Sequence, residues 1–294
     1  MRTRAFLASR WLSVVASLAL AGCHAALLEP RGPIGRSEKV ILIDSLAIML
    51  AIVVPTIVAT LAFAWWYRAS NRKARYLPEW AFSGRIELVV WSIPILVILL
   101  LGGVTWIGSR ALDPARPLAS NSAPLEVQVV SLDWKWLFIY PAERVAAVNQ
   151  LVVPAGVPIH FTLTSASVLN TFFVPQLGSM IYTMNGMETQ LYLHADDPGT
   201  YLGRSAHFSG DGFSDMRFEV RALPAAQFAD WTRATRAAGG ALDAQAYRAL
   251  ARQSIADRPS TYATVEDGLF HKIVTQALPP GPGPALEHGA AKER

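Results

Sequence analysis

Few side chains in this sequence have the type and spacing to do chemistry, and several of them fall in one short stretch. Ser205, His207 and Ser209 alternate there, followed by Phe213 and Met216. Histidine and methionine are copper ligands, whereas thiolates are the donors that hold copper most firmly and serine hydroxyls are poor substitutes. With no thiolate and no second histidine nearby in sequence, we expect His207 not to be a metal ligand.

A second chemically capable residue is Glu87, which directly precedes an uncharged segment, 88–107. A carboxylate at the edge of such a segment is often only a solvated charge. It can also take up and release protons, because its proton affinity responds to burial and to neighbouring charges. The residues alone leave both interpretations open.

The single cysteine, Cys23, excludes an internal disulfide. Three arginines lie within the first ten residues and precede an uncharged run, 11–21, which is the layout of an export signal. The sequence Leu20-Ala21-Gly22-Cys23 resembles the cleavage box of bacterial lipoproteins, whose cysteine is lipidated and becomes the mature N-terminus. We predict an acylated Cys23, carrying palmitate; the alternative is a cysteine buried in an apolar helix.

The elements that position these residues include two membrane segments. Charged residues make up 16% of the chain, against about 25% in soluble domains. Two apolar segments, 40–67 and 88–108, exceed the ~20 residues that cross a bilayer, and bilayer helices tolerate the prolines inside them, Pro55 and Pro94. The loop between them carries five lysines and arginines, so the positive-inside rule places it in the cytoplasm and the rest of the chain in the periplasm.

After residue 124, short runs rich in β-branched and aromatic residues alternate with turn signals, which predicts an antiparallel sandwich or barrel. The predicted strands are 125–131, 134–140, 150–153, 159–165, 188–194 and 216–222. Residues 225–255 have helical periodicity, broken at Gly239-Gly240. The whole prediction is a signal peptide (1–22), periplasmic linker (23–39), membrane helix (40–67), cytoplasmic loop (68–87), membrane helix (88–108), linker (109–124), β domain (125–223), helical region (224–277) and disordered tail (278–294).

Several motifs, in this order, resemble subunit II of the haem–copper oxidases. Glu87 to Pro94 fits that family's Glu-x-x-x-Trp-x-x-Pro pattern, and Asp133-Trp134-Lys135-Trp136 opens the β domain. Two further matches are Pro175-Gln176-Leu177-Gly178 and Gly199-Thr200-Tyr201-Leu202-Gly203. The resemblance implies a hairpin of two transmembrane helices, an all-β cupredoxin-like Greek-key sandwich and a short helical C-terminal segment.

The resemblance also implies where copper ligands would stand. In the cytochrome c oxidase branch, two cysteines, two histidines and a methionine hold a copper pair. The matching positions here are Ser205, Ser209, Asn170 and Phe213, and only Met216 is retained. Serine hydroxyls cannot replace bridging thiolates. We therefore expect these to be vestigial positions without metal, the pattern of quinol oxidases of the cytochrome bo type.

The function implied is that of subunit II of a proton-pumping ubiquinol oxidase in a bacterial inner membrane. Haems, one copper and ubiquinol would belong to the complex, and none of them to this chain. The implied partners are the haem–copper subunit I and subunits III and IV; neither cytochrome c nor nucleic acid is expected, and the net charge of +4 is modest. The family places Glu87 near the mouth of a proton channel, and we expect Trp134 and Trp136 to pack against the catalytic subunit.

Two alternatives remain at this stage. One is an orphan periplasmic lipoprotein on a disused cupredoxin scaffold. The other is a cytochrome c oxidase subunit that has lost its copper, which four replaced ligand positions disfavour.

Overall fold

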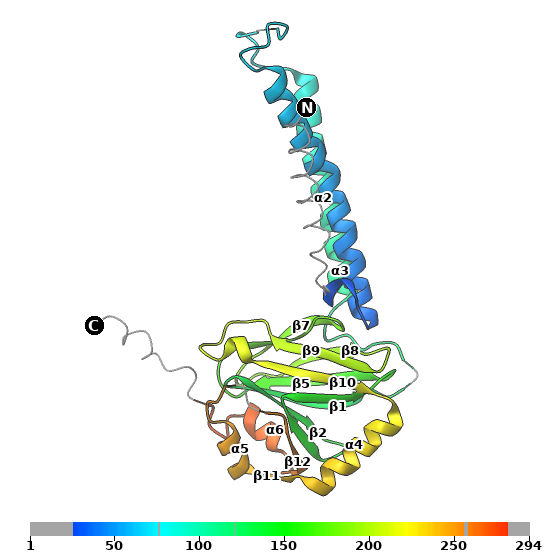
Figure 1. Cartoon of the computed structure of the whole chain (residues 1–294), viewed down its shortest axis with the longest axis vertical. Helices are drawn as coiled ribbons and strands as arrows, with labels where there is room; N and C mark the ends of the chain where they lie inside the picture. Colours follow the sequence, from blue (N-terminus) through cyan, green and yellow to red (C-terminus); the bar gives the residue numbers. More distant parts are fainter. Residues whose placement is uncertain (1–25, 76, 121, 256–257, 282–294) are drawn as a thin grey trace, which may run out of the picture.

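A hairpin of two long helices stands on a β domain in the computed structural model, which describes residues 26–75, 77–120, 122–255 and 258–281 (Figure 1). The helices are α2 (Pro33–Trp66) and α3 (Gly84–Ala111), preceded by a short 3-10 turn, η1 (Ala26–Leu28). Within the described residues these two helices are long and apolar enough to cross a membrane, and their apolar windows are not buried by the protein itself. Pro55 and Pro94 lie inside them, as expected.

The first helix begins seven residues before the predicted membrane segment, so residues 33–39 are helical rather than a linker. Pro33 is well suited to a first turn because its fixed φ matches the helix and its missing N–H needs no partner there. The start of α2 and the residues just before it contact the β domain. The backbone N–H of Arg31 donates to Gln176 O at 2.7 Å, and that of Gly35 to Leu177 O at 3.2 Å. The second helix begins at Gly84, so Glu87 lies in its first turn.

The β domain is a sandwich of two sheets, which confirms the predicted fold class. A seven-stranded sheet has the order β11-β12-β3-β2-β1-β5-β8, and a five-stranded sheet the order β4-β10-β9-β6-β7. The sheets are mixed rather than antiparallel, because β1 pairs in parallel with β5, β4 with β10, and β11 with β12. The strands are β1 (Leu125–Leu132), β2 (Lys135–Tyr140), β3 (Val145–Val148), β4 (Gln150–Pro154), β5 (Pro158–Ser165), β6 (Asn170–Val174), β7 (Gly178–Thr183), β8 (Thr189–His194), β9 (Gly199–Ser205), β10 (Arg217–Leu223), β11 (Gly240–Leu242) and β12 (Ser260–Val265).

An aromatic core lies between the sheets. Trp136, which is fully buried, contacts the rings of Phe172 and Phe218, each at 5.5 Å between centroids. Trp134 is only 7% exposed and belongs to the same cluster. The prediction that these two tryptophans pack against a partner subunit is wrong, because both are buried inside their own domain.

Tyr140 links the two sheets at one edge. Its hydroxyl donates to Val152 O at 2.9 Å and accepts from the Val152 N–H at 2.8 Å. Burial raises the pKa of Tyr140, which keeps the hydroxyl protonated and able to donate. A strand of the larger sheet is thereby tied to β4 of the smaller one.

The C-terminal region mixes helices with strands, in contrast to the helical prediction. Helices α4 (Ala225–Ala238), α5 (Ala244–Leu250) and α6 (Leu269–Val274) alternate with β11 and β12. Strand β12 extends the larger sheet by pairing with β3. Part of the predicted disordered tail is also packed on the domain, because Leu278 is buried and the Gly281 N–H donates to Ala166 O at 2.6 Å. The rest of that tail lies outside the described residues.

The joint between α2 and the sandwich is made of close contacts. Arg36 pairs with Asp196, which also lies 2.9 Å from His194 Nδ1, and the Ser179 hydroxyl donates to Glu38 at 2.8 Å. Gly32 lies against the backbone at the end of β8: a Cβ on Gly32 would come within 2.2 Å of His194 O. Ile34 is 8% exposed and belongs to the core cluster. The membrane helix therefore enters the domain as part of its core.

Candidate functional site

The five positions that the resemblance matches to copper ligands come from two strands of the smaller sheet and from the segment between β9 and β10. Asn170 begins β6 and Ser205 ends β9. Ser209 lies in the following loop, Phe213 begins a 3-10 turn, η2 (Phe213–Asp215), and Met216 directly precedes β10. Because β6 and β9 are hydrogen-bonded neighbours, the fold brings together residues that are far apart in sequence.

Hydrogen bonds join these side chains to one another. The Ser205 hydroxyl lies 3.2 Å from Asn170 Oδ1 and 3.2 Å from His207 O, and its single proton serves one of them at a time. Asn170 Nδ2 donates to Val168 O at 3.3 Å. The Ser209 hydroxyl points to the Met216 sulfur at 3.9 Å. Asn170, Ser205, Ser209 and Met216 are all buried, so we call these four residues the serine cluster.

Trp134 supports the serine cluster, a role that the sequence did not indicate. Its indole N–H donates to Ser209 O at 3.0 Å. Gly212 packs on its ring so closely that a Cβ would come within 2.4 Å. The residue has a φ of 64°, in the left-handed region, which is unusual for a large side chain. The only sequence signal was its place in the Asp-Trp-Lys-Trp motif.

The donor set of this site does not fit a copper pair. It offers two hydroxyls, one amide and one thioether, whereas copper sites of this kind need thiolates and imidazoles. His207 is exposed, and its ring lies edge-on to Tyr182 at 6.0 Å. Across the described part of the chain, no three His, Cys, Asp or Glu side chains are grouped as a metal site.

The surface around the serine cluster exposes several apolar side chains. Phe208 is 73% exposed and contacts the ring of Phe213 at 5.6 Å. A cavity of about 450 Å³ opens beside Ser205, with Arg204 and Arg217 among its lining residues. Other exposed apolar side chains lie on β9 (Leu202), on β7 next to β6 (Met180 and Tyr182) and in the loop after β7 (Met187). An apolar surface of this kind is typical of a protein contact.

Glu87 lies far from the serine cluster, near the other end of the hairpin (Figure 1). Its side chain is exposed and accepts a hydrogen bond from the Trp91 indole N–H at 3.1 Å. The two residues are one helical turn apart, so the bond fixes the carboxylate along the outer face of α3. Cys23, the predicted lipidation site, lies outside the described residues.

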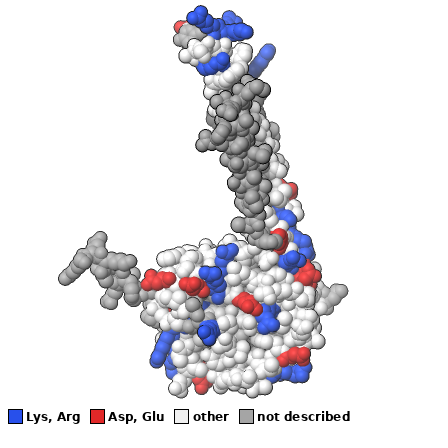
Figure 2. All heavy atoms as spheres, viewed as in Figure 1, with Lys and Arg blue, Asp and Glu red and all other residues white. Residues whose placement is uncertain are grey.

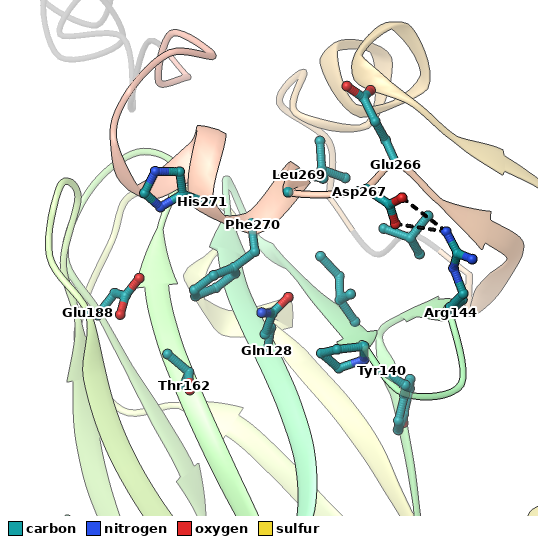
Figure 3. Close-up of a pocket in the computed structure, with 14 residues that line it drawn as sticks. Gln128, Tyr140, Arg144, Thr162, Glu188, Glu266, Asp267, Leu269, Phe270 and His271 are labelled. Atoms are coloured by element: carbon teal, nitrogen blue, oxygen red, sulfur yellow. Dashed lines mark hydrogen bonds and ion pairs between the residues drawn. The ribbon is translucent and has the colours of Figure 1, made fainter.

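A further pocket, of about 400 Å³, lies between α6 and the outer face of the larger sheet (Figure 3). Three of its charged side chains are paired: Arg144 contacts Asp267 at 2.8 Å, and Glu266 pairs with Lys272, whose hydrogen bond lowers the pKa of Glu266. His271 of α6 and Glu188, which directly precedes β8, lie at the same end of it (Figure 3).

Comparison with known proteins defines first the class of this chain. A family model described as "Cytochrome C oxidase subunit II, periplasmic domain" matches residues 127–223, and one described as "COX Aromatic Rich Motif" matches residues 236–281. The β domain is therefore of the oxidase subunit II type, and the second match covers the segment that adds β12 and α6.

Similar proteins identify the family within this class. The chain is 49% identical to "Ubiquinol oxidase subunit 2" of Acetobacter aceti, over 88% of this chain and 85% of that protein. It is 45% identical to "Cytochrome bo(3) ubiquinol oxidase subunit 2" of Pseudomonas aeruginosa, over 97% and 86%, and 43% identical to that of Pseudomonas putida, over 90% and 84%. The chain belongs to the family of ubiquinol oxidase subunit 2, a component of an oxidoreductase complex.

Proposed function

We propose that this chain is the copper-free subunit 2 of a haem–copper complex that oxidises ubiquinol, reduces oxygen to water and moves protons outward across a bacterial inner membrane. Electrons pass from ubiquinol directly to the haem-bearing subunit I, so this chain needs no redox centre. Subunits III and IV complete the complex. The high identity to proteins named ubiquinol oxidase subunit 2 favours this function over an orphan periplasmic lipoprotein.

One observation carries the copper-free assignment: the family's ligand positions are filled by groups that satisfy one another. Ser205 and Asn170 share a hydrogen bond, and Ser209 points to Met216. Buried polar groups are costly when they lack partners. The loops that meet at these positions are joined here by hydrogen bonds between the side chains themselves.

We expect the purified complex to contain only the one copper of subunit I, and this chain alone to contain none. Copper and haem are measured together by elemental analysis and absorption spectroscopy. Two additional coppers per complex, with a near-infrared band, would contradict the proposal.

A restored variant provides the matched control. Changing Asn170→His, Ser205→Cys, Ser209→Cys and Phe213→His returns the side-chain ligands that the family resemblance implies, and Met216 is already present. This variant should take up copper where the natural chain does not. The comparison separates missing ligands from a domain that cannot admit metal at all.

We also propose that Glu87 feeds protons toward subunit I. It lies in the first turn of α3 with its carboxylate held by Trp91, at the end of the hairpin where the basic loop places the cytoplasm. A carboxylate on the outer face of a membrane helix is exposed in this chain alone and is available to a neighbouring subunit.

Cys23 is proposed to carry a lipid after cleavage behind Gly22. Residue 26, only three residues later, lies in η1 beside α2, and Lys39 Nζ donates to Leu28 O at 2.8 Å. Three residues span at most ~10 Å, so an acyl chain on Cys23 can enter the same leaflet as the start of α2.

Mass spectrometry of the mature chain should therefore show an N-terminal, acylated Cys23. Cys23→Ala should block processing and leave the signal peptide attached, whereas oxidase turnover should persist because two helices still anchor the chain. An intact Met1 or an unmodified Cys23 in the natural chain would contradict this prediction.

A further inference from the structure

The cytoplasmic end of the hairpin contains a pocket of about 810 Å³ that none of the functions above uses. Its walls come from the end of α2, the start of α3 and the loop between them. Most of its lining is apolar and exposed, including Phe63, Leu77, Trp80 and Ile86, each more than half exposed. Exposed apolar walls in a soluble protein would be costly, but at a membrane surface they meet lipid.

Hydrogen bonds hold the first part of the loop that lines this pocket, directly after α2. Asn71 Nδ2 donates to Trp66 O at 2.5 Å, and Asn71 Oδ1 accepts from the Lys73 N–H at 3.1 Å. Arg68 stacks over the ring of Trp65 at 4.8 Å and donates to Trp65 O at 2.7 Å. These contacts fix the side of the pocket that adjoins α2.

Its charge is strongly positive. Figure 2 shows lysines and arginines gathered at this end of the molecule. Two of them, Arg68 and Arg75, line the pocket. Within the described part of the chain, Arg75 forms no hydrogen bond or ion pair with another side chain, so its guanidinium is available to an external anion. A guanidinium binds phosphate with two parallel hydrogen bonds.

We propose that this pocket binds one anionic phospholipid of the inner leaflet, with its phosphate at Arg75 and its acyl chain along the apolar walls. Apolar walls, a cationic rim and an aromatic belt coincide at one membrane interface, and basic pockets at the cytoplasmic ends of membrane helices suit such headgroups. A free phosphate ion would use the arginine but not the walls.

The test uses the intact complex, stripped of lipid in detergent and titrated with phosphatidylglycerol or with phosphatidylcholine of the same acyl chains. Native mass spectrometry counts the lipids retained. The natural complex should retain one phosphatidylglycerol in preference to phosphatidylcholine. Arg75→Gln should weaken that binding about fivefold, since one basic residue contributes ~1 kcal/mol near a lipid surface, and Arg75→Lys should restore most of it.

Arg72→Gln is the matched control, because Arg72 lies in the same loop but does not line the pocket. It should change retention less than twofold. Equal binding of both lipids, or equal losses for Arg72→Gln and Arg75→Gln, would overturn the proposal in favour of diffuse surface charge. Loss of subunit I from the Arg75→Gln complex with unchanged lipid binding would overturn it in favour of a protein contact. None of these outcomes depends on whether the chain binds copper.

Discussion

Trp136→Ala should lower the free energy of unfolding of the β domain by about 3 to 5 kcal/mol, the largest stability change that we expect from a single substitution. The side chain is fully buried and contacts Phe172 and Phe218 between the sheets. Removing the indole leaves a cavity that this close-packed core cannot fill. Denaturant unfolding of the detergent-solubilised chain, followed by pulse proteolysis of the domain, measures the loss.

Trp136→Phe is the informative control. The indole nitrogen of Trp136 is buried and has no hydrogen-bond partner among the described residues, so phenylalanine removes an unsatisfied donor while keeping a ring between the sheets. Its loss of stability should be clearly smaller than that of alanine. If the two variants unfold alike, or if alanine costs less than ~1 kcal/mol, the aromatic core does not hold the sheets together as described.

Glu87→Gln and Glu87→Ala should each slow quinol oxidation about tenfold, which corresponds to ~1.4 kcal/mol on the limiting barrier. A proton-collecting group must bind a proton from water and pass it on, and neither an amide nor a methyl group can do so. Glu87→Asp should recover part of the rate because it restores the carboxylate at a shorter reach. Turnover at matched haem content, from about pH 6 to 8, gives the comparison.

Glu79→Gln is the control for this series, because Glu79 is an exposed carboxylate in the loop between α2 and α3, outside both helices. The complex with Glu79→Gln should oxidise quinol at the same rate as the natural complex. Wild-type turnover in all three Glu87 variants would reduce Glu87 to an interfacial charge. Poor assembly, visible as a loss of haem, would assign it to a subunit contact instead.

Much of the sandwich was predictable because its strands carry a local signal. Runs rich in β-branched and aromatic residues placed β1, β2, β4, β5, β8 and β10 within about two residues. Strands β7 and β9 begin at glycine, and β12 is embedded between helical segments, so local patterns gave no sign of them. The parallel pairing of β1 with β5 depends on long-range topology, which periodicity does not encode.

The serine cluster was predictable in membership but not in geometry. Family resemblance identified Asn170 and Ser205, but their hydrogen bond crosses 35 residues of sequence and exists because β6 and β9 are neighbours. Trp134 was misjudged for a related reason. A left-handed backbone turns its ring into the domain, and no residue pattern indicates such a conformation at a tryptophan.

The joint at Ile34 has a mechanical consequence. A helix of 34 residues is ~51 Å long, so a small change of angle where α2 joins the sandwich becomes a large displacement at its other end. A tilt of about ten degrees at this joint would move the far end of α2 by roughly 9 Å. Two contacts oppose such a tilt: Gly32 lies directly against His194 O, and Arg36 pairs with Asp196. The orientation of the β domain and the position of the loop between α2 and α3, at opposite ends of the helix, therefore depend on each other.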